Sequence, residues 1–234
     1  MSSEFSLTTF NSEGKLKQIE NALKAVSNGE TAIGIRYKTG VVLCVEKNIK
    51  SVLVDETSVR KIQNVSQNIG STYAGLSGDY RVLLQACRKH NMKYKLIYEE
   101  PILLGNLARE TCKTFQEFTQ SGGVRPFGIS ILMAGVDYDG PQLYQLDPSG
   151  VYYEWKATAI GKNSSNAKAF LEKKYNENYS RDDAIQDALR ALKDGFEGVM
   201  NEKNVEIGYV DQKDGLFTVL PQREVGIYLG FISD

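Results

Sequence analysis

The sequence is poor in the residues from which most metal and disulfide sites are built. Its 234 residues include one histidine and three cysteines, and the cysteines (Cys44, Cys87 and Cys112) do not follow metal-ligand spacing. An odd, scattered set of cysteines is typical of buried free thiols in a reducing compartment. His90 falls near the end of a predicted helix, where a surface position is expected. We therefore expect neither a zinc site nor any bound cofactor.

The sequence also lacks a net charge and long hydrophobic runs. It has 28 basic and 29 acidic residues, a formal net charge of −1, which gives no electrostatic reason to expect a nucleic acid or membrane partner. No apolar run approaches the ~20 residues of a membrane-spanning helix. The first ten residues, MSSEFSLTTF, lack the basic start and apolar centre of a secretory signal. These absences favour a location in the cytoplasm and nucleus.

Hydrophobic periodicity predicts an alternation between strands and pairs of helices. Strands are predicted at residues 31–37, 41–46, 62–65, 71–76, 127–136, 142–146, 151–154, 157–160, 205–210 and 216–220, and helices at 12–29, 77–91, after Pro101, at 165–176, at 181–200 and at the C-terminus. The strand at 41–46 is apolar on both faces and should be covered on both sides. The strands at 151–154 and 157–160 are expected to pair with each other around Trp155. The order indicates an α+β fold, a four-layer αββα sandwich of residues 12–234 behind a polar tail of residues 1–11.

The first predicted helix, at residues 12–29, stands before the first strand. Ser12 is expected to cap it and Glu13 to favour its positive end, while Gly29 is expected to end it in the left-handed conformation. Its apolar residues form one stripe: Leu16, Ile19, Ala22, Leu23 and Val26. By itself this pattern indicates an ordinary amphipathic helix packed on its own domain.

Several stretches, in order along essentially the whole chain, carry a family resemblance. They include FSLTTF at 5–10, GKL at 14–16, SGGVRPFG at 121–128, DPSG at 147–150, WKATAIGKN at 155–163 and FLEKKY at 170–175. On these stretches the chain resembles the alpha-type subunits of the 20S proteasome, and among them the subunit-2 type. The resemblance implies the N-terminal-nucleophile hydrolase fold, a four-layer αββα sandwich with the extra N-terminal helix that marks alpha-type subunits.

The resemblance also implies that the chain is not an enzyme. Catalytic beta-type relatives expose an N-terminal threonine, whose amine serves as the base for its own hydroxyl. That position falls near Glu30 here, with 29 residues before it, and Glu46 and Lys61 lie near the positions of the catalytic carboxylate and lysine. The alternative is a processed N-terminal-threonine hydrolase that exposes Thr31. It would require cleavage after Glu30, where family propeptides have glycine.

The resemblance implies a non-catalytic structural and gating subunit of the outer alpha ring, with a role in ubiquitin-dependent protein degradation. Its implied partners are neighbouring alpha-1 and alpha-3 types in a seven-membered ring, beta-type subunits of the adjacent ring, and C-terminal tails of regulatory-particle ATPases or other activators. A stand-alone binding protein with the same fold is a further alternative.

The same resemblance assigns two sets of site residues. A pocket for the regulator tail is expected at Lys61, Gly14, Glu20, Gly29, Gly75 and Leu76, with Lys61 pairing with the tail carboxylate. A solvated surface lysine is the alternative for Lys61. The gate tail is expected to include Ser3, Glu4 and Phe5. Because Ser3, Ser12 and Asn21 stand where the family commonly has tyrosine, proline and tyrosine, we expect a weak contribution to the open-gate cluster.

Overall fold

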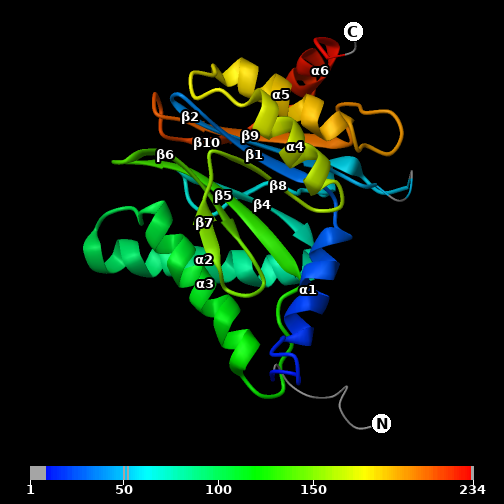
Figure 1. The fold of residues 1–234 in the computed structure, drawn as a ribbon. Coiled ribbons are helices and arrows are strands. Elements are labelled where there is room, and N and C mark those ends of the chain that lie inside the picture. Colours follow the sequence, from blue (N-terminus) through cyan, green and yellow to red (C-terminus); the bar gives the residue numbers. More distant parts are fainter. Residues whose placement is uncertain (1–8, 50, 52, 233–234) are drawn as a thin grey trace.

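The computed structural model describes residues 9–49, 51 and 53–232, and these form four layers (Figure 1). Helices α4 (Ser164–Lys174), α5 (Arg181–Lys193) and α6 (Gln222–Gly230) cover one sheet, and α2 (Ser77–Tyr98) and α3 (Leu104–Gln120) cover the other. A short 3-10 helix, η1, spans Glu56–Ser58. The predicted αββα sandwich is therefore confirmed.

Both sheets have five strands, and every pairing in them is antiparallel. The first has the order β10 (Phe217–Val219), β9 (Val205–Asp211), β2 (Gly40–Glu46), β1 (Ala32–Tyr37), β8 (Ala157–Ile160). The second has the order β3 (Gln63–Asn64), β4 (Ile69–Gly75), β5 (Ile129–Asp137), β6 (Gly140–Leu146), β7 (Tyr152–Glu154). The first sheet thus joins strands from the two ends of the chain.

Three apolar layers hold the sandwich together. Ile33 and Ile35 face α4 and α5, whereas Leu43 and Val45 face the second sheet. A third cluster lies between the second sheet and α2 and α3. Every residue of β2 is buried, so the prediction of a strand covered on both sides is confirmed. Burial on both faces explains why β2 reads as a continuous apolar run instead of an alternating one.

The predicted pairing of residues 151–154 with 157–160 is wrong. The strand β7 pairs with β6 in the second sheet, while β8 pairs with β1 in the first. Between them the backbone N–H of Trp155 donates to the Leu143 carbonyl (2.8 Å), and the Lys156 carbonyl accepts the backbone N–H of Arg36 (2.8 Å). The chain crosses from one sheet to the other here because each strand finds a partner far away in sequence.

Two helices end several residues away from their predicted ends. The helix α2 continues to Tyr98, past the predicted end at residue 91, and α5 ends at Lys193 instead of residue 200. The start of α5 is as predicted: Ser180 and Asp183 form a capping box, each side chain accepting the other residue's backbone N–H.

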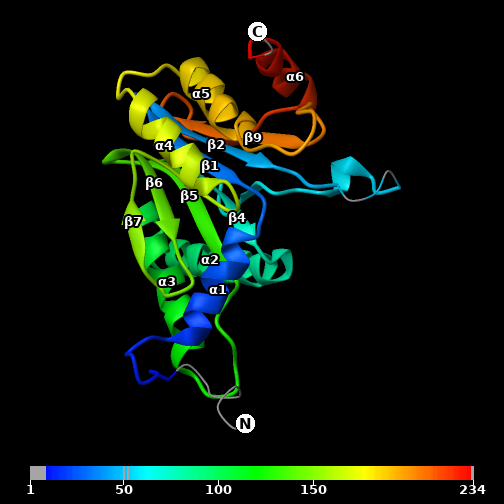
Figure 2. The ribbon, with the colours of Figure 1, turned by 45° about the vertical axis from the view of Figure 1, so that its right-hand side comes forward.

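The first helix, α1 (Lys17–Ser27), begins later than predicted, and Ser12 does not cap it. Instead the Asn11 side-chain oxygen accepts the backbone N–H groups of Glu13 (3.0 Å) and Lys15 (2.8 Å), forming a separate turn. From that turn α1 runs beside β4 and β5, with its N-terminal end pointing away from α4 and α5 (Figures 1 and 2). Of its predicted stripe, only Ala22 and Val26 are buried.

The glycine after α1 acts through close approach and not through left-handed geometry. Asn28 ends the helix in the right-handed region, and Gly29 is not among the residues with positive φ, so the predicted left-handed end is wrong. A Cβ atom on Gly29 would lie 2.2 Å from the Gly75 nitrogen. Only glycine lets these two backbones meet.

Candidate functional site around Lys61

Lys61 lies in the interior beside the end of α1, and not on the solvated surface. Its side chain is 6% exposed, and its Nζ lies 3.0 Å from Oε2 of Glu30, whose side chain is 27% exposed. The same Nζ lies 3.9 Å from the centroid of the Tyr73 ring, on β4. The alternative of a solvated lysine is therefore wrong, since a carboxylate and an aromatic face replace water around the ammonium.

The backbone of Lys61 is fixed to the first sheet. One carboxylate oxygen of Glu206, on β9, accepts the backbone N–H groups of Lys61 (2.7 Å) and Ile62 (3.1 Å). Burial nevertheless raises the pKa of Glu206, against the effect of these two bonds. Lys61 is thus held from both sheets, with its backbone bound to Glu206 on one side and its ammonium against Tyr73 on the other.

The two partners of the ion pair respond differently to burial. Burial acts to raise the pKa of Glu30, but the charge of Lys61 and hydrogen bonds outweigh it, so that pKa lies below its usual value. Burial lowers the pKa of Lys61, and the charge of Glu30 is the largest effect opposing it. Glu30 is therefore a carboxylate at neutral pH, and its charge favours the protonated form of Lys61.

Gly29, Gly75 and Leu76 lie together next to this pair. Gly75 has φ +112°, and a Cβ atom there would lie 2.1 Å from the Gly128 carbonyl oxygen. Leu76 follows at the start of α2 and keeps half of its surface exposed. The structure thus brings four of the predicted pocket residues together around Glu30: Lys61, Gly29, Gly75 and Leu76.

A second ion pair lies on the other side of Thr31. Nζ of Lys162 lies 2.9 Å from Oε1 of Glu46, and the side chains are 22% and 5% exposed. Burial lowers the pKa of Lys162, but the hydrogen bond and charge of Glu46 raise it more, so the net shift is upward. Thr31 is 1% exposed; its N–H faces Glu46 Oε2 (3.4 Å), and its hydroxyl accepts the Asn163 N–H (3.4 Å).

Comparison with known proteins decides the family. The chain matches the family "Proteasome subunit" over residues 26–210, and over residues 4–25 it matches the N-terminal signature of the A-type proteasome subunits. It belongs to the proteasome subunit family, in its alpha-type branch.

Three relatives of this proteasome chain are of the same subunit type. It is 55% identical to the proteasome alpha type-2-B subunit of Arabidopsis thaliana, with 98% of this chain and 97% of the relative covered. It is 52% identical to the alpha type-2 subunit of Dictyostelium discoideum, with 96% of each chain covered. It is 50% identical to that of Drosophila melanogaster, with 97% of each covered. The resemblance to proteasome alpha-type subunits, and to the subunit-2 type, is confirmed.

As an alpha-type proteasome subunit, the chain is a non-catalytic structural and gating component of the core, and other proteasome subunits are its partners. The alternative of a processed hydrolase exposing Thr31 is wrong. Alpha-type subunits are non-catalytic, and in this chain the backbone N–H of Lys162 donates to the carbonyl of Gly29 (2.9 Å), two residues before Thr31. Thr31 itself is buried, so its hydroxyl is enclosed by the chain.

The other predicted pocket and gate residues lie elsewhere. Gly14 belongs to the turn before α1, with φ +74°, and Glu20 is in the first turn of that helix. At 1.5 Å per residue, the length of α1, roughly 16 Å, separates Gly14 from the cluster around Lys61. Ser3, Glu4 and Phe5 lie outside the described residues.

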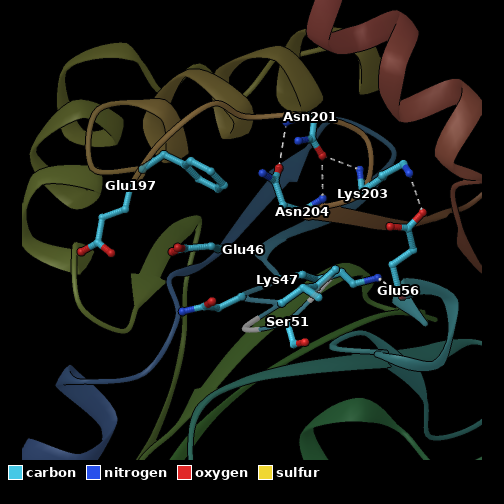
Figure 3. A pocket seen from close by; sticks show the side chains of 11 residues that line it. Glu46, Lys47, Ser51, Glu56, Glu197, Asn201, Lys203 and Asn204 are labelled. Atoms are coloured by element: carbon cyan, nitrogen blue, oxygen red, sulfur yellow. Dashed lines mark hydrogen bonds and ion pairs between the residues drawn. The ribbon is translucent and has the colours of Figure 1, made fainter. Parts of the chain in front are cut away.

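A polar pocket of ≈ 350 Å³ opens beside the second pair, between the end of β2 and residues 196–204 (Figure 3). Its basic side chains have partners: Lys47 donates to the Glu56 carbonyl (3.1 Å), and Lys203 lies 2.9 Å from the Glu56 carboxylate. Lys162 lies between Glu46 and Glu197, 3.7 Å from the latter. The charged side chains that line the pocket thus already have partners within the chain.

Three residues at this site were not found by sequence reasoning. Lys162, Glu206 and Tyr73 hold the two pairs in place, but they lie far from Glu30 and Glu46 in sequence. The available signal was a charged residue inside an apolar strand, as at Glu206 in β9, because such a residue is rarely buried without a partner.

In the described part of the chain, no group of three or more histidine, cysteine or acidic residues is arranged to hold a metal ion. Over the same residues, no helix is both long enough and apolar enough to cross a bilayer.

Proposed function

We propose that this alpha-type chain anchors the C-terminal tails of regulatory particles through Lys61. The observation that supports this is the Glu30–Lys61 pair: the niche already holds a carboxylate 3.0 Å from Nζ. A peptide's terminal carboxylate has the same chemistry as that side chain and suits a compact ammonium. The adjoining Leu76 is half-exposed and offers an apolar side chain to the residues before that carboxylate.

The proposal includes the neighbours and location of the chain. It takes a place between alpha-1 and alpha-3 types in a seven-membered outer ring, stacked on beta-type subunits, in the cytoplasm and nucleus. Head-to-tail contacts that close after a fixed rotation produce such rings. Gly14 and Glu20, at the far end of α1, then face a docking tail from the neighbouring side, and residues 1–11, with Ser3, Glu4 and Phe5, contribute to the gate.

A Lys61→Met variant in the assembled particle tests tail anchoring. Peptidase activity stimulated by regulatory particles should fall, with basal activity unchanged, and cross-linking of a photoreactive tail peptide to this chain should be lost. The matched control is Lys113→Met, which removes an exposed lysine paired with Glu110 on α3. Equal cross-linking in all three particles would refute the role of Lys61.

Ring membership and gating have their own tests. The chain should co-migrate with a very large peptidase sensitive to threonine-directed inhibitors, and elution as a free 26.1 kDa chain would contradict a constitutive ring role.

The double variant Ser3→Tyr with Asn21→Tyr should raise stimulated peptidase activity by restoring aromatic side chains to the gate. Unchanged activity would remove the support for a weakened gate at these positions.

A further inference from the structure

The space around the Lys61 ammonium is occupied by other side chains of the same chain. The ammonium is covered by the Tyr73 ring on one side and by the Glu30 carboxylate on another. In the ion pair Glu30 is the partner open to solvent, with 27% of its side chain exposed against 6% for Lys61. A carboxylate arriving from solvent on this side therefore meets Glu30 before it meets the cation.

The backbone under Glu30 cannot move aside easily, but its side chain can. Gly29 is packed directly against Gly75, and Thr31 is enclosed between Glu46 and Asn163. Both neighbours of Glu30 are thus fixed, so the carboxylate can leave Lys61 only by rotation of its own side-chain torsions.

We propose that Glu30 is a built-in competitor that occupies the carboxylate site of Lys61 and must be displaced before an external carboxylate can bind. This inference rests on the proposed tail-anchoring function and adds a regulatory element to that site. Two carboxylates cannot share one buried ammonium without repelling each other. If Glu30 covers Lys61 nine-tenths of the time, the apparent Kd of the tail rises about tenfold.

The test uses assembled particles that carry Glu30→Gln, which keeps the shape of the side chain and removes its charge. The probe is a photoreactive synthetic peptide copying the C-terminal tail of a regulatory-particle ATPase, made with a free C-terminal carboxylate and as its C-terminal amide. Cross-linking to this chain is measured against peptide concentration. The matched control is Glu154→Gln, which removes the exposed partner of Arg36 on β7.

For the free acid, Glu30→Gln should lower the half-saturating concentration about tenfold, the factor that corresponds to Glu30 covering Lys61 nine-tenths of the time. The amide and the Glu154→Gln control should show no change. Glu30→Asp, whose shorter side chain draws the charge back from Lys61, should give an intermediate gain and serves if Glu30→Gln particles fail to assemble.

Two outcomes would overturn the inference, and they differ. If Lys61→Met abolishes cross-linking of the acid while Glu30→Gln and Glu30→Asp leave it unchanged or weaker, the tail-anchoring function stands and competition by Glu30 is wrong. If Lys61→Met also changes nothing, the anchoring function is wrong and the competitor falls with it.

Discussion

The two ion pairs on either side of Thr31 have opposite burial. In the Glu30–Lys61 pair the cation is enclosed and the anion reaches solvent, with side chains 27% and 6% exposed. In the Lys162–Glu46 pair the anion is enclosed and the cation reaches solvent, with side chains 22% and 5% exposed. The partner that reaches water could be solvated without the pair, whereas the enclosed partner could not. In each pair, removal of the more exposed partner should therefore lower the free energy of unfolding more than removal of the enclosed partner.

The largest loss of stability is expected from a substitution that disturbs both ion pairs. Gly29→Ala puts a Cβ atom 2.2 Å from the Gly75 nitrogen, and the contact is with backbone that cannot turn away. The shift would move Glu30 and the Gly29 carbonyl that binds Lys162, and should cost about 3–4 kcal/mol of unfolding free energy, more than ordinary overpacking. Urea unfolding measures this. Gly78→Ala, where nothing lies within 4 Å of the new Cβ, is the control and should change stability little.

The next effect separates the partners of the second pair. Lys162→Met leaves the Glu46 carboxylate enclosed without an opposite charge, and should lower the free energy of unfolding by about 3 kcal/mol. Glu46→Gln leaves a lysine that reaches solvent, and should cost about 1 kcal/mol. The same unfolding measurements apply. Equal losses in the two variants would show that burial does not decide the cost.

In the first pair, removal of the acidic partner should cost more stability than removal of the basic partner, the reverse of the second pair. Glu30→Gln leaves the Lys61 ammonium enclosed and should cost about 2 kcal/mol, less than a fully buried pair because Glu30 reaches solvent. Lys61→Met frees a carboxylate that can turn into water, and should cost less than about 1 kcal/mol. A larger loss in Lys61→Met than in Glu30→Gln would contradict the comparison.

The smallest effect concerns pH. The pKa of Glu30 in the folded chain lies below its ordinary value of 4.5, so the unfolded state binds a proton more tightly. The stability that Glu30 contributes is therefore fully present above pH 4.5 and is lost as pH falls through the lowered pKa. Measured as unfolding free energy, the difference between the native chain and Glu30→Gln should shrink on acidification. A difference independent of pH would exclude the charge of Glu30 as its source.

Periodicity alone was sufficient for the layers of the fold but not for every pairing in them. The fully apolar run at β2 predicted a strand covered on both sides, and the helix predicted from residue 181 begins there. The partners of β7 and β8 were predicted wrongly: β7 pairs with β6, and β8 pairs with β1 from a distant segment. The role of Gly29 was predicted wrongly, because glycine is required both where two backbones approach closely and where a helix ends in the left-handed conformation. The sequence alone does not distinguish the two cases.

The site was predictable only in part, and mainly through the family resemblance. That resemblance pointed to Lys61, Gly29, Gly75 and Leu76, which the fold brings together. The partner of Lys61 was missed because Glu30 lies 31 positions away, and Lys162 lies 116 positions from Glu46. Ion pairs across such separations leave no periodic pattern in a single sequence.

The strand order of the first sheet has a consequence for biosynthesis. The hairpin of β1 and β2 is made early, yet its neighbours β8 and β9 come from residues 157–160 and 205–211. Until the ribosome has released those residues, β2 has an apolar face on each side and an unpaired edge, a combination that promotes aggregation. The nascent chain therefore cannot complete this sheet before residues 205–211 have been made, and the hairpin of β1 and β2 must wait for them.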